Sequence, residues 1–327
     1  MKDINSEVKI LLWGPPNSGK TWFLNSFTRS VSLCDLYDDR FKYDLGEYSG
    51  GLLTDQLHIS SPFEIGDKHI PRDHTWLFSR SPKQNTYNAK ISAYSHLLHL
   101  IDYPGDMIFN FSEDTSTLIK DVDEIIVFLD PTLTKDYHSK IAVSKNDEIY
   151  FNDDLIDEEF KLNKSGSQKL ISVTEYQAQV QKLFDFLIHW GREETLIIFC
   201  VTKADEWLSK FKGNISDSIQ HFFGENIYRF IQTYRKKFNI HIYINSAVGF
   251  LDEDKKESNF NISSNKMINS NIWDPINSEL PVFWLLEKIE LDRLKRKKAL
   301  VDQIFGDQKV KSYLPYFKID RGGYYAE

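Results

Sequence analysis

Short apolar runs alternate with longer amphipathic stretches along the chain, and this alternation predicts an α/β fold. The clearest runs, VKILLW, EIIVFL and LIIFCV, are apolar almost throughout, which is typical of strands buried inside a sheet. The pattern predicts strands over residues 8–13, 75–80, 89–94, 96–101, 124–129, 195–201 and 240–244. It predicts helices over 21–29, 112–122, 173–190, 217–238 and 281–300.

Three polar stretches interrupt the alternation, and we interpret them as insertions at about 31–74, 132–169 and 252–271. The first has little periodicity and is rich in Gly, Asp, Ser and Tyr, so we expect it to be mostly loop. The second is acid-rich, with one alternating run, EIYFND, that is compatible with a hairpin. The third is rich in Ser, Asn, Lys and Glu, which predicts a mobile loop. We expect a single domain over 1–300, followed by a C-terminal tail over 301–327.

The composition narrows the classes of function. Of the 327 residues, 41% are hydrophobic and 27% are charged, which provides a sizeable core and argues against global disorder. The net charge of -8 disfavours nucleic acid as the main partner, because binding to phosphate backbones needs a basic surface. Two cysteines cannot form a disulfide framework and fit a reducing compartment. Since no apolar run approaches the ~20 residues of a membrane-spanning helix, we expect a cytoplasmic protein with no membrane span.

The strongest motif is GPPNSGKT, which has the form GxxxxGK[ST] of a phosphate-binding loop. Backbone N–H groups of such a loop surround the phosphates, and the positive end of the following helix faces them. The lysine reaches the terminal phosphates, and the hydroxyl that follows it binds Mg²⁺. The alternative, a Gly-rich turn with no ligand, is disfavoured because the motif lies between a predicted strand and a predicted helix. The candidate residues are Gly14, Pro15, Pro16, Asn17, Ser18, Gly19, Lys20, Thr21 and Trp22.

A second motif, DYPG, follows the predicted strand 96–101. A carboxylate at Asp102 can hold Mg²⁺, directly or through water, opposite Thr21. The backbone N–H of Gly105 can be offered to a γ-phosphate. The alternative is a simple strand-ending turn, but the preceding phosphate loop favours the functional interpretation.

A third motif, TKAD, follows the predicted strand 195–201 and contains Thr202, Lys203 and Asp205. Guanine presents two neighbouring donors, N1–H and the N2 amino group, and one carboxylate can accept both. Adenine has an acceptor at N1 and would leave Asp205 unpaired, so the motif predicts a preference for guanine. The stem of Lys203 can lie over the base plane. The alternative for Asp205 is an acid in the first turn of a helix.

A fourth pair, Ser246 and Ala247, comes just after the predicted strand 240–244. At this position, the backbone N–H of Ala247 could bind the carbonyl oxygen of guanine. All four motifs follow predicted strands, and open parallel sheets bind ligands at the carboxyl ends of their strands.

In this order, the motifs GPPNSGKT, DYPG, TKAD and SA resemble those of a P-loop GTPase of the translation-factor/Ras-like class, over about residues 5 to 300. The resemblance implies a three-layer Ras-like G domain, with a mostly parallel six-stranded sheet and helices on both faces. It also implies GTP/GDP and Mg²⁺ as ligands, and two switch loops that sense the nucleotide. The runs EIIVFLDP and WDPIN…PVFWLLEKI resemble bacterial GTPases of conflict or defence systems.

Two departures from the family pattern concern catalysis. About 80 residues separate Lys20 from Asp102, roughly twice the gap in small GTPases, so switch I carries a large insertion. The resemblance implies a switch I threonine that contacts both Mg²⁺ and the γ-phosphate; Thr75 is the first choice, ahead of Thr86 and Thr54. Asp106 stands where many relatives have a water-orienting Gln, and a carboxylate there would repel the γ-phosphate. The catalytic candidates are therefore Lys20, Thr75, Gly105 and Asp106.

These features leave three hypotheses. The first is a slow GTPase that acts as a nucleotide-dependent switch, with a protein effector or an activating partner that completes catalysis. The second is a GTP-gated interaction module with little or no intrinsic hydrolysis. The third is an ATPase that uses the same phosphate loop.

Overall fold

The computed structural model describes thirteen stretches of the chain. These are residues 6–33, 41–49, 72–82, 94–103, 119–134, 173–190, 195–210, 215–235, 237–252, 257–261, 266–286, 288–289 and 325–326.

A single large sheet runs through the described residues, with its eight strands in the order β10-β7-β6-β5-β1-β4-β3-β2. Its centre is parallel and consists of β7 (Asn239–Ile244), β6 (Leu196–Val201), β5 (Glu124–Leu129), β1 (Ser6–Trp13) and β4 (Tyr94–Asp102). Antiparallel strands extend it on both sides: β3 (Arg72–Pro82) and β2 (Phe41–Ser49) beyond β4, and β10 (Tyr325–Ala326) beyond β7. The expected α/β fold with a mostly parallel sheet is confirmed.

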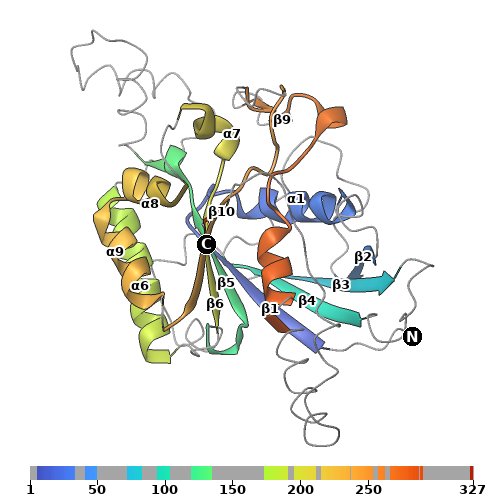
Figure 1. Cartoon of the computed structure of the whole chain (residues 1–327), viewed down its shortest axis with the longest axis horizontal. Coiled ribbons are helices and arrows are strands. Elements are labelled where there is room, and N and C mark those ends of the chain that lie inside the picture. Colours follow the sequence, from blue (N-terminus) through green and yellow to red (C-terminus); the bar gives the residue numbers. More distant parts are fainter. Residues whose placement is uncertain are drawn as a thin grey trace, which may run out of the picture.

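Helices cover both faces of the sheet (Figure 1). On one face lie α6 (Val173–Trp190), α8 (Ile215–Phe223) and α9 (Glu225–Tyr234). On the other face lie α1 (Lys20–Leu33) and the helical residues 280–286. The shorter elements are α7 (Ala204–Trp207), η3 (Pro131–Leu133), η4 (Leu208–Lys210), β8 (Phe260–Asn261), β9 (Lys266–Met267) and η5 (Ser270–Ile272). Among the described helices, none is long and apolar enough to cross a membrane.

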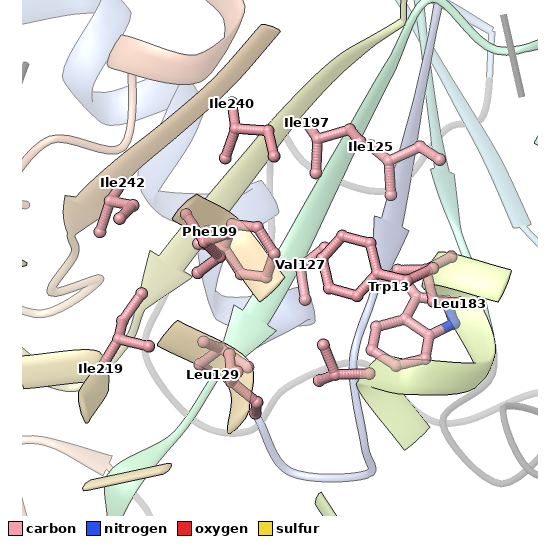
Figure 2. Packing of buried hydrophobic residues seen from close by; sticks show 14 of the residues in the cluster. Trp13, Ile125, Val127, Leu129, Leu183, Ile197, Phe199, Ile219, Ile240 and Ile242 are labelled. Atoms are coloured by element: carbon pink, nitrogen blue, oxygen red, sulfur yellow. The ribbon is translucent and has the colours of Figure 1, made fainter. Parts of the chain in front are cut away.

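The central strands are apolar throughout because each face of the sheet meets helices. Every residue of β5 and of β6 is buried. Ile125, Val127 and Leu129 point toward α6, where they pack with Ile197, Phe199 and Leu183 (Figure 2). The alternate side chains of β5, Ile126 and Phe128, pack with α1 on the opposite face. Each fully buried aliphatic or aromatic side chain contributes about 1.5–3 kcal/mol, so this double-sided packing fixes the sheet.

The sheet is larger than expected, with eight strands among the described residues in place of six. The prediction that residues 31–74 are mostly loop was wrong for 41–49, which form β2, and for 72–74, which begin β3. The sequence of β2, FKYDLGEYS, alternates apolar and polar residues over its first half, and this period of two is the signal that was missed. The additional strand β10 lies in the predicted tail and pairs with Ile242 and Tyr243.

Two other predicted elements differ from the structure. The helix predicted over 217–238 is divided into α8 and α9 at Gly224, whose φ of 84° lies in a region that favours glycine. The strand predicted over 89–94 lies outside the described residues except for Tyr94, which begins β4. Most of the predicted insertion 132–169 and of the predicted tail also lies outside them, so the domain limits stay predictions.

Candidate functional site

Four sequence motifs follow parallel strands and therefore gather at one edge of the sheet. The phosphate-loop sequence follows β1, and Asp102 ends the neighbouring strand β4 in register with Leu12. Thr202 follows β6, and Ser246 comes two residues after the end of β7. The elements beyond these strands, α1, α7 and the segment around β9, lie together in the upper half of Figure 1. Motifs that are far apart in the sequence thus share one edge.

The backbone of the phosphate-loop sequence explains its glycines. A side chain at Gly14 would place a Cβ 2.8 Å from the Cβ of Phe128 in β5, which is closer than such atoms come. Gly19 has a φ of 94°, and Asn17 a φ of 64°, so the loop makes two left-handed turns between β1 and α1. Pro16 and Asn17 form an exposed tip, whereas Ser18 is buried.

Lys20 places its positive charge beside this loop. Its Nζ donates hydrogen bonds to the carbonyl oxygens of Gly14, at 2.7 Å, and Pro15, at 3.1 Å. The side chain is only 7% exposed, and Lys20 is also the first residue of α1. A buried cation and the positive end of a helix therefore lie together, which is an arrangement that favours an anion.

The predicted Mg²⁺ ligands lie at the same edge. Thr21 belongs to the first turn of α1 and is half-buried, and Asp102 is likewise partly buried at the end of β4. Within the described ranges, no group of three or more His, Cys, Asp or Glu residues could hold a metal by itself. Mg²⁺ is commonly held by one or two protein oxygens together with substrate phosphates and waters, so one hydroxyl and one carboxylate fit this ion.

The switch residues are only partly described. Thr75 was predicted to begin a strand over 75–80, and it lies inside β3, which begins three residues earlier; there Thr75 pairs with His99. Arg72, at the beginning of β3, is the residue that pairs with Asp102. Gly105, Asp106, Thr86 and Thr54 lie outside the described residues, so their roles stay predictions.

Lys203 of the third motif forms an ion pair that sequence reasoning missed. Its Nζ lies 2.7 Å from Oδ2 of Asp130, which is completely buried at the end of β5, and donates a hydrogen bond to Oγ1 of Thr132 at 3.1 Å. Burial by itself lowers the pKa of Lys203, but the carboxylates of Asp130 and Glu206 outweigh it and leave this pKa raised. The lysine is therefore held as a cation. The only sequence signal for Asp130 was its place directly after the run EIIVFL.

The backbone at Lys203 orients the rest of the third motif. Lys203 is in the left-handed conformation, with φ 54° and ψ 40°, and α7 begins directly after it. The N–H of Ala204 donates to the carbonyl oxygen of Asn245 at 3.0 Å, which joins the end of β6 to the end of β7. The third and fourth motifs are thereby connected through their backbones.

Asp205 accepts hydrogen bonds from two serines. Its Oδ1 accepts from Oγ of Ser246 and its Oδ2 from Oγ of Ser258, both at 2.5 Å, and the residue is only 4% exposed. Burial raises the pKa of Asp205, whereas the two serine hydroxyls and Lys203 act in the opposite direction. The predicted neighbourhood of Asp205 and Ser246 is present, but Ser258 was not predicted.

The segment around Ile276 supports the fourth motif. The backbone groups of Ser246 and Ile276 exchange two hydrogen bonds, at 3.2 and 2.8 Å. The indole N–H of Trp273 donates to the carbonyl oxygen of Ala247 at 2.8 Å. Gly249, with a φ of 75°, passes so close to Asp274 that a Cβ would lie 2.3 Å from its carbonyl oxygen. The sequence WDPIN therefore serves as a backbone support for Ser246 and Ala247.

The fold and the site define an α/β protein with a mostly parallel central sheet and four polar motifs on one edge of it. Comparison of the chain with protein-family models and with curated proteins gave no match.

Proposed function

We propose that the chain is a GTP-binding protein that hydrolyses GTP with Mg²⁺ and acts as a nucleotide-dependent switch. The observation that carries this proposal is the position of Asp205. It is the residue that the sequence assigns to guanine, and it lies at the same sheet edge as the phosphate-loop sequence. To bind a whole nucleotide, the residue for the base and the loop for the phosphates must lie no farther apart than the nucleotide is long. In the sheet, the strand β5 alone separates β6, which precedes Asp205, from β1, which precedes the phosphate loop.

The base would be selected by the carboxylate of Asp205. An ionised carboxylate offers about four lone-pair positions on its two oxygens. The hydroxyls of Ser246 and Ser258 each bond a different oxygen, so the carboxylate keeps acceptor capacity for the N1–H and N2 amino donors of guanine. Adenine would present an acceptor to the same group and leave it unpaired.

The phosphates would be bound by the loop from Gly14 to Gly19 and by Lys20. The loop offers backbone N–H groups at the amino end of α1, and the ammonium of Lys20 would stabilise the charge that develops on the γ-phosphate as water attacks it. Thr21 and Asp102 would hold Mg²⁺, which supplies further neutralisation of the phosphate charge when it is bound. The assignments of Gly105 and Thr75 follow from the sequence resemblance.

One feature of the sequence favours a second candidate function. Asp106 replaces the usual water-orienting glutamine, which supports a GTP-gated interaction module with little intrinsic hydrolysis. Single-turnover hydrolysis by the isolated chain separates the two: measurable phosphate release at a rate above that of free GTP excludes the second candidate. An activating partner would then raise the rate further.

Replacement of Lys20 tests the phosphate half of the proposal. We expect Lys20→Ala to lower GTP binding by about a hundredfold or more, because a buried cation that faces the phosphates is lost. Lys182→Ala, at an exposed position of α6, is the matched control and should bind GTP like the wild type. Thermal unfolding shows whether each variant is folded. Equal GTP binding by folded Lys20→Ala and wild type contradicts the proposal.

Replacement of Asp205 tests the base half. We expect Asp205→Asn to lose most of the preference for GDP over ADP, because its amide offers only one acceptor oxygen to the two donors of guanine. Binding of both nucleotides is measured by calorimetry, with Asp185→Asn as an exposed control. An unchanged preference in Asp205→Asn would favour an ATPase or another use of the phosphate loop.

A further inference from the structure

Ser258 is a polar contact of Asp205 that belongs to none of the four motifs. It lies 53 residues after Asp205, in a segment that the composition had marked as a mobile loop. We propose that Ser258 is a specificity-determining residue of the site, which together with Ser246 positions the carboxylate of Asp205 for guanine. This inference rests on the proposed function, because it needs guanine as the ligand.

The two serines orient their hydroxyl protons in the same way. Oγ of Ser246 accepts a hydrogen bond from the backbone N–H of Gly249 at 2.9 Å, and Oγ of Ser258 accepts one from the N–H of Phe260 at 3.2 Å. A serine hydroxyl has one proton, and with an N–H on the acceptor side that proton is directed at the carboxylate. Each oxygen of Asp205 thus has its own donor, and the plane of the carboxylate is fixed from both sides.

This positioning matters because guanine needs an ionised acceptor in one orientation. A protonated Asp205 would present a donor to N1–H, and burial favours that form. Hydroxyl donors favour the ionised form instead, in which both carboxylate oxygens can accept hydrogen bonds. Removal of Ser258 would therefore weaken the recognition of guanine more than that of adenine.

The segment that carries Ser258 is held firmly in place. The backbone N–H of Asn259 donates to the carbonyl oxygen of Gly249 at 3.1 Å, and Ser258 forms an antiparallel bridge with Phe250. The side chain of Asn259 is fully buried, and its amide donates to the backbone carbonyl of Asn269 and accepts from the backbone N–H of that residue. Residues 257–261 therefore form a fixed part of the site, and a rigid support is what a positioning residue requires.

The same segment also contacts the helix that follows the phosphate loop. The ring of Phe260 packs edge-on against the indole of Trp22, with centroids 5.6 Å apart and an interplanar angle of 82°. Trp22 directly follows Thr21 in the first turn of α1. The segment thus lies between the carboxylate for the base and the helix for the phosphates, and it connects the two halves of the site.

Calorimetric titration of the full chain with GDP and with ADP, each with Mg²⁺, tests the proposal. We expect Ser258→Ala to bind GDP about tenfold more weakly, because the carboxylate that accepts from guanine loses one of the two hydroxyls that orient it, with ADP binding changed by less than about twofold. Ser258→Thr keeps the hydroxyl and should restore most of the preference. Ser258→Cys, of similar size but with a weak S–H donor, should behave like Ser258→Ala. Ser209→Ala, at an exposed serine, is the matched control.

A double-mutant cycle with Asp205→Ala separates positioning from a general effect on structure. In the Asp205→Ala background, removal of the Ser258 hydroxyl should change nucleotide preference no further, since its partner is already absent. Equal weakening of GDP and ADP, or an unchanged preference in both Ser258→Ala and Ser258→Cys, overturns the role of Ser258 while the proposed function stands. If the wild-type protein shows no preference for guanine, both the role of Ser258 and the proposed function are contradicted.

Discussion

Two buried acidic residues lie at opposite ends of the strand β5, Glu124 at its amino end and Asp130 directly after its carboxyl end. Their surroundings differ. Asp130, after the carboxyl end, pairs with Lys203 and also accepts hydrogen bonds from Thr132. Glu124, at the amino end, is equally buried, but its carboxyl oxygens have no hydrogen-bond partner among the described residues. Burial raises the pKa of Glu124 well above its usual value, and the nearby charge of Lys288 offsets this only in part.

The difference shows what each edge of the sheet can hold. A buried carboxylate is stable only where a cation and hydrogen bonds replace its water, and otherwise it takes up a proton. The carboxyl edge supplies such partners for Asp130 and Asp205, whereas at the amino edge burial raises the pKa of Glu124 and thereby favours its neutral form. The carboxyl edge, where the four motifs lie, thus stabilises buried ionised carboxylates that the amino edge does not.

Asp130→Asn should have the largest effect on stability. The new amide would place a donor against the ammonium of Lys203, so a partly buried cation would lose its counter-charge. Since Lys203 is a quarter exposed, we expect a loss of about 3 kcal/mol, at the lower end of the range for broken buried pairs. Urea denaturation measures this loss, and Asp185→Asn on the exposed face of α6 should cost less than about 0.5 kcal/mol. Equal stabilities of Asp130→Asn and the wild type would show that the ion pair between Asp130 and Lys203 does not contribute to stability.

Tyr176→Phe should have an intermediate effect at the same end of β5. The hydroxyl of Tyr176 donates to the carbonyl oxygen of Phe128 at 3.0 Å and accepts from the N–H of Asp130 at 2.9 Å. Its removal leaves two buried backbone groups without these bonds, so we expect a loss of about 1–2 kcal/mol. Tyr228→Phe, on α9, is the control. A loss no larger than that of the control would mean that water or a small shift replaces the hydroxyl.

Glu124→Gln should have the smallest effect between pH 4 and pH 5, and its effect depends on pH. Because the folded-state pKa of Glu124 lies above the ordinary 4.5, the folded chain retains a proton that the unfolded chain releases as the pH rises through that value. Wild-type stability therefore falls with rising pH, and the glutamine variant lacks this contribution. Between pH 4 and pH 5, we expect the free energy of unfolding of the variant to rise by about 0.7 kcal/mol relative to that of the wild type. The difference should grow further at higher pH. Glu175→Gln, on the surface of α6, should show no such trend, and a pH-independent difference for Glu124→Gln would contradict its protonation.

The parts of the fold that the sequence predicted are those with local signals. β5 and β6 were predictable because every residue in them is buried and apolar. The proximity of Asp205 and Ser246 was predictable because Asp205 follows β6 and Ser246 follows β7, and these two strands are parallel neighbours. β2 was missed because its alternation is weakened by Gly46 and by polar residues at its end.

The contacts that could not be predicted join residues that no local pattern relates. The pairing of Lys203 with Asp130 depends on the register that sets Leu129 beside Val201, and a sequence pattern does not specify a register. The position of Ser258 depends on the path of a polar segment whose folding is set by buried hydrogen bonds of Asn259. Polar composition indicated mobility there because it does not reveal such tertiary bonds.

The most direct test of the account is a calorimetric comparison of GDP and ADP binding to the full-length chain in the presence of Mg²⁺. We expect GDP to bind at least about a hundredfold more tightly than ADP, because only guanine offers two donors to the carboxylate of Asp205. Equal affinities for the two nucleotides, or no binding of GDP, would contradict it.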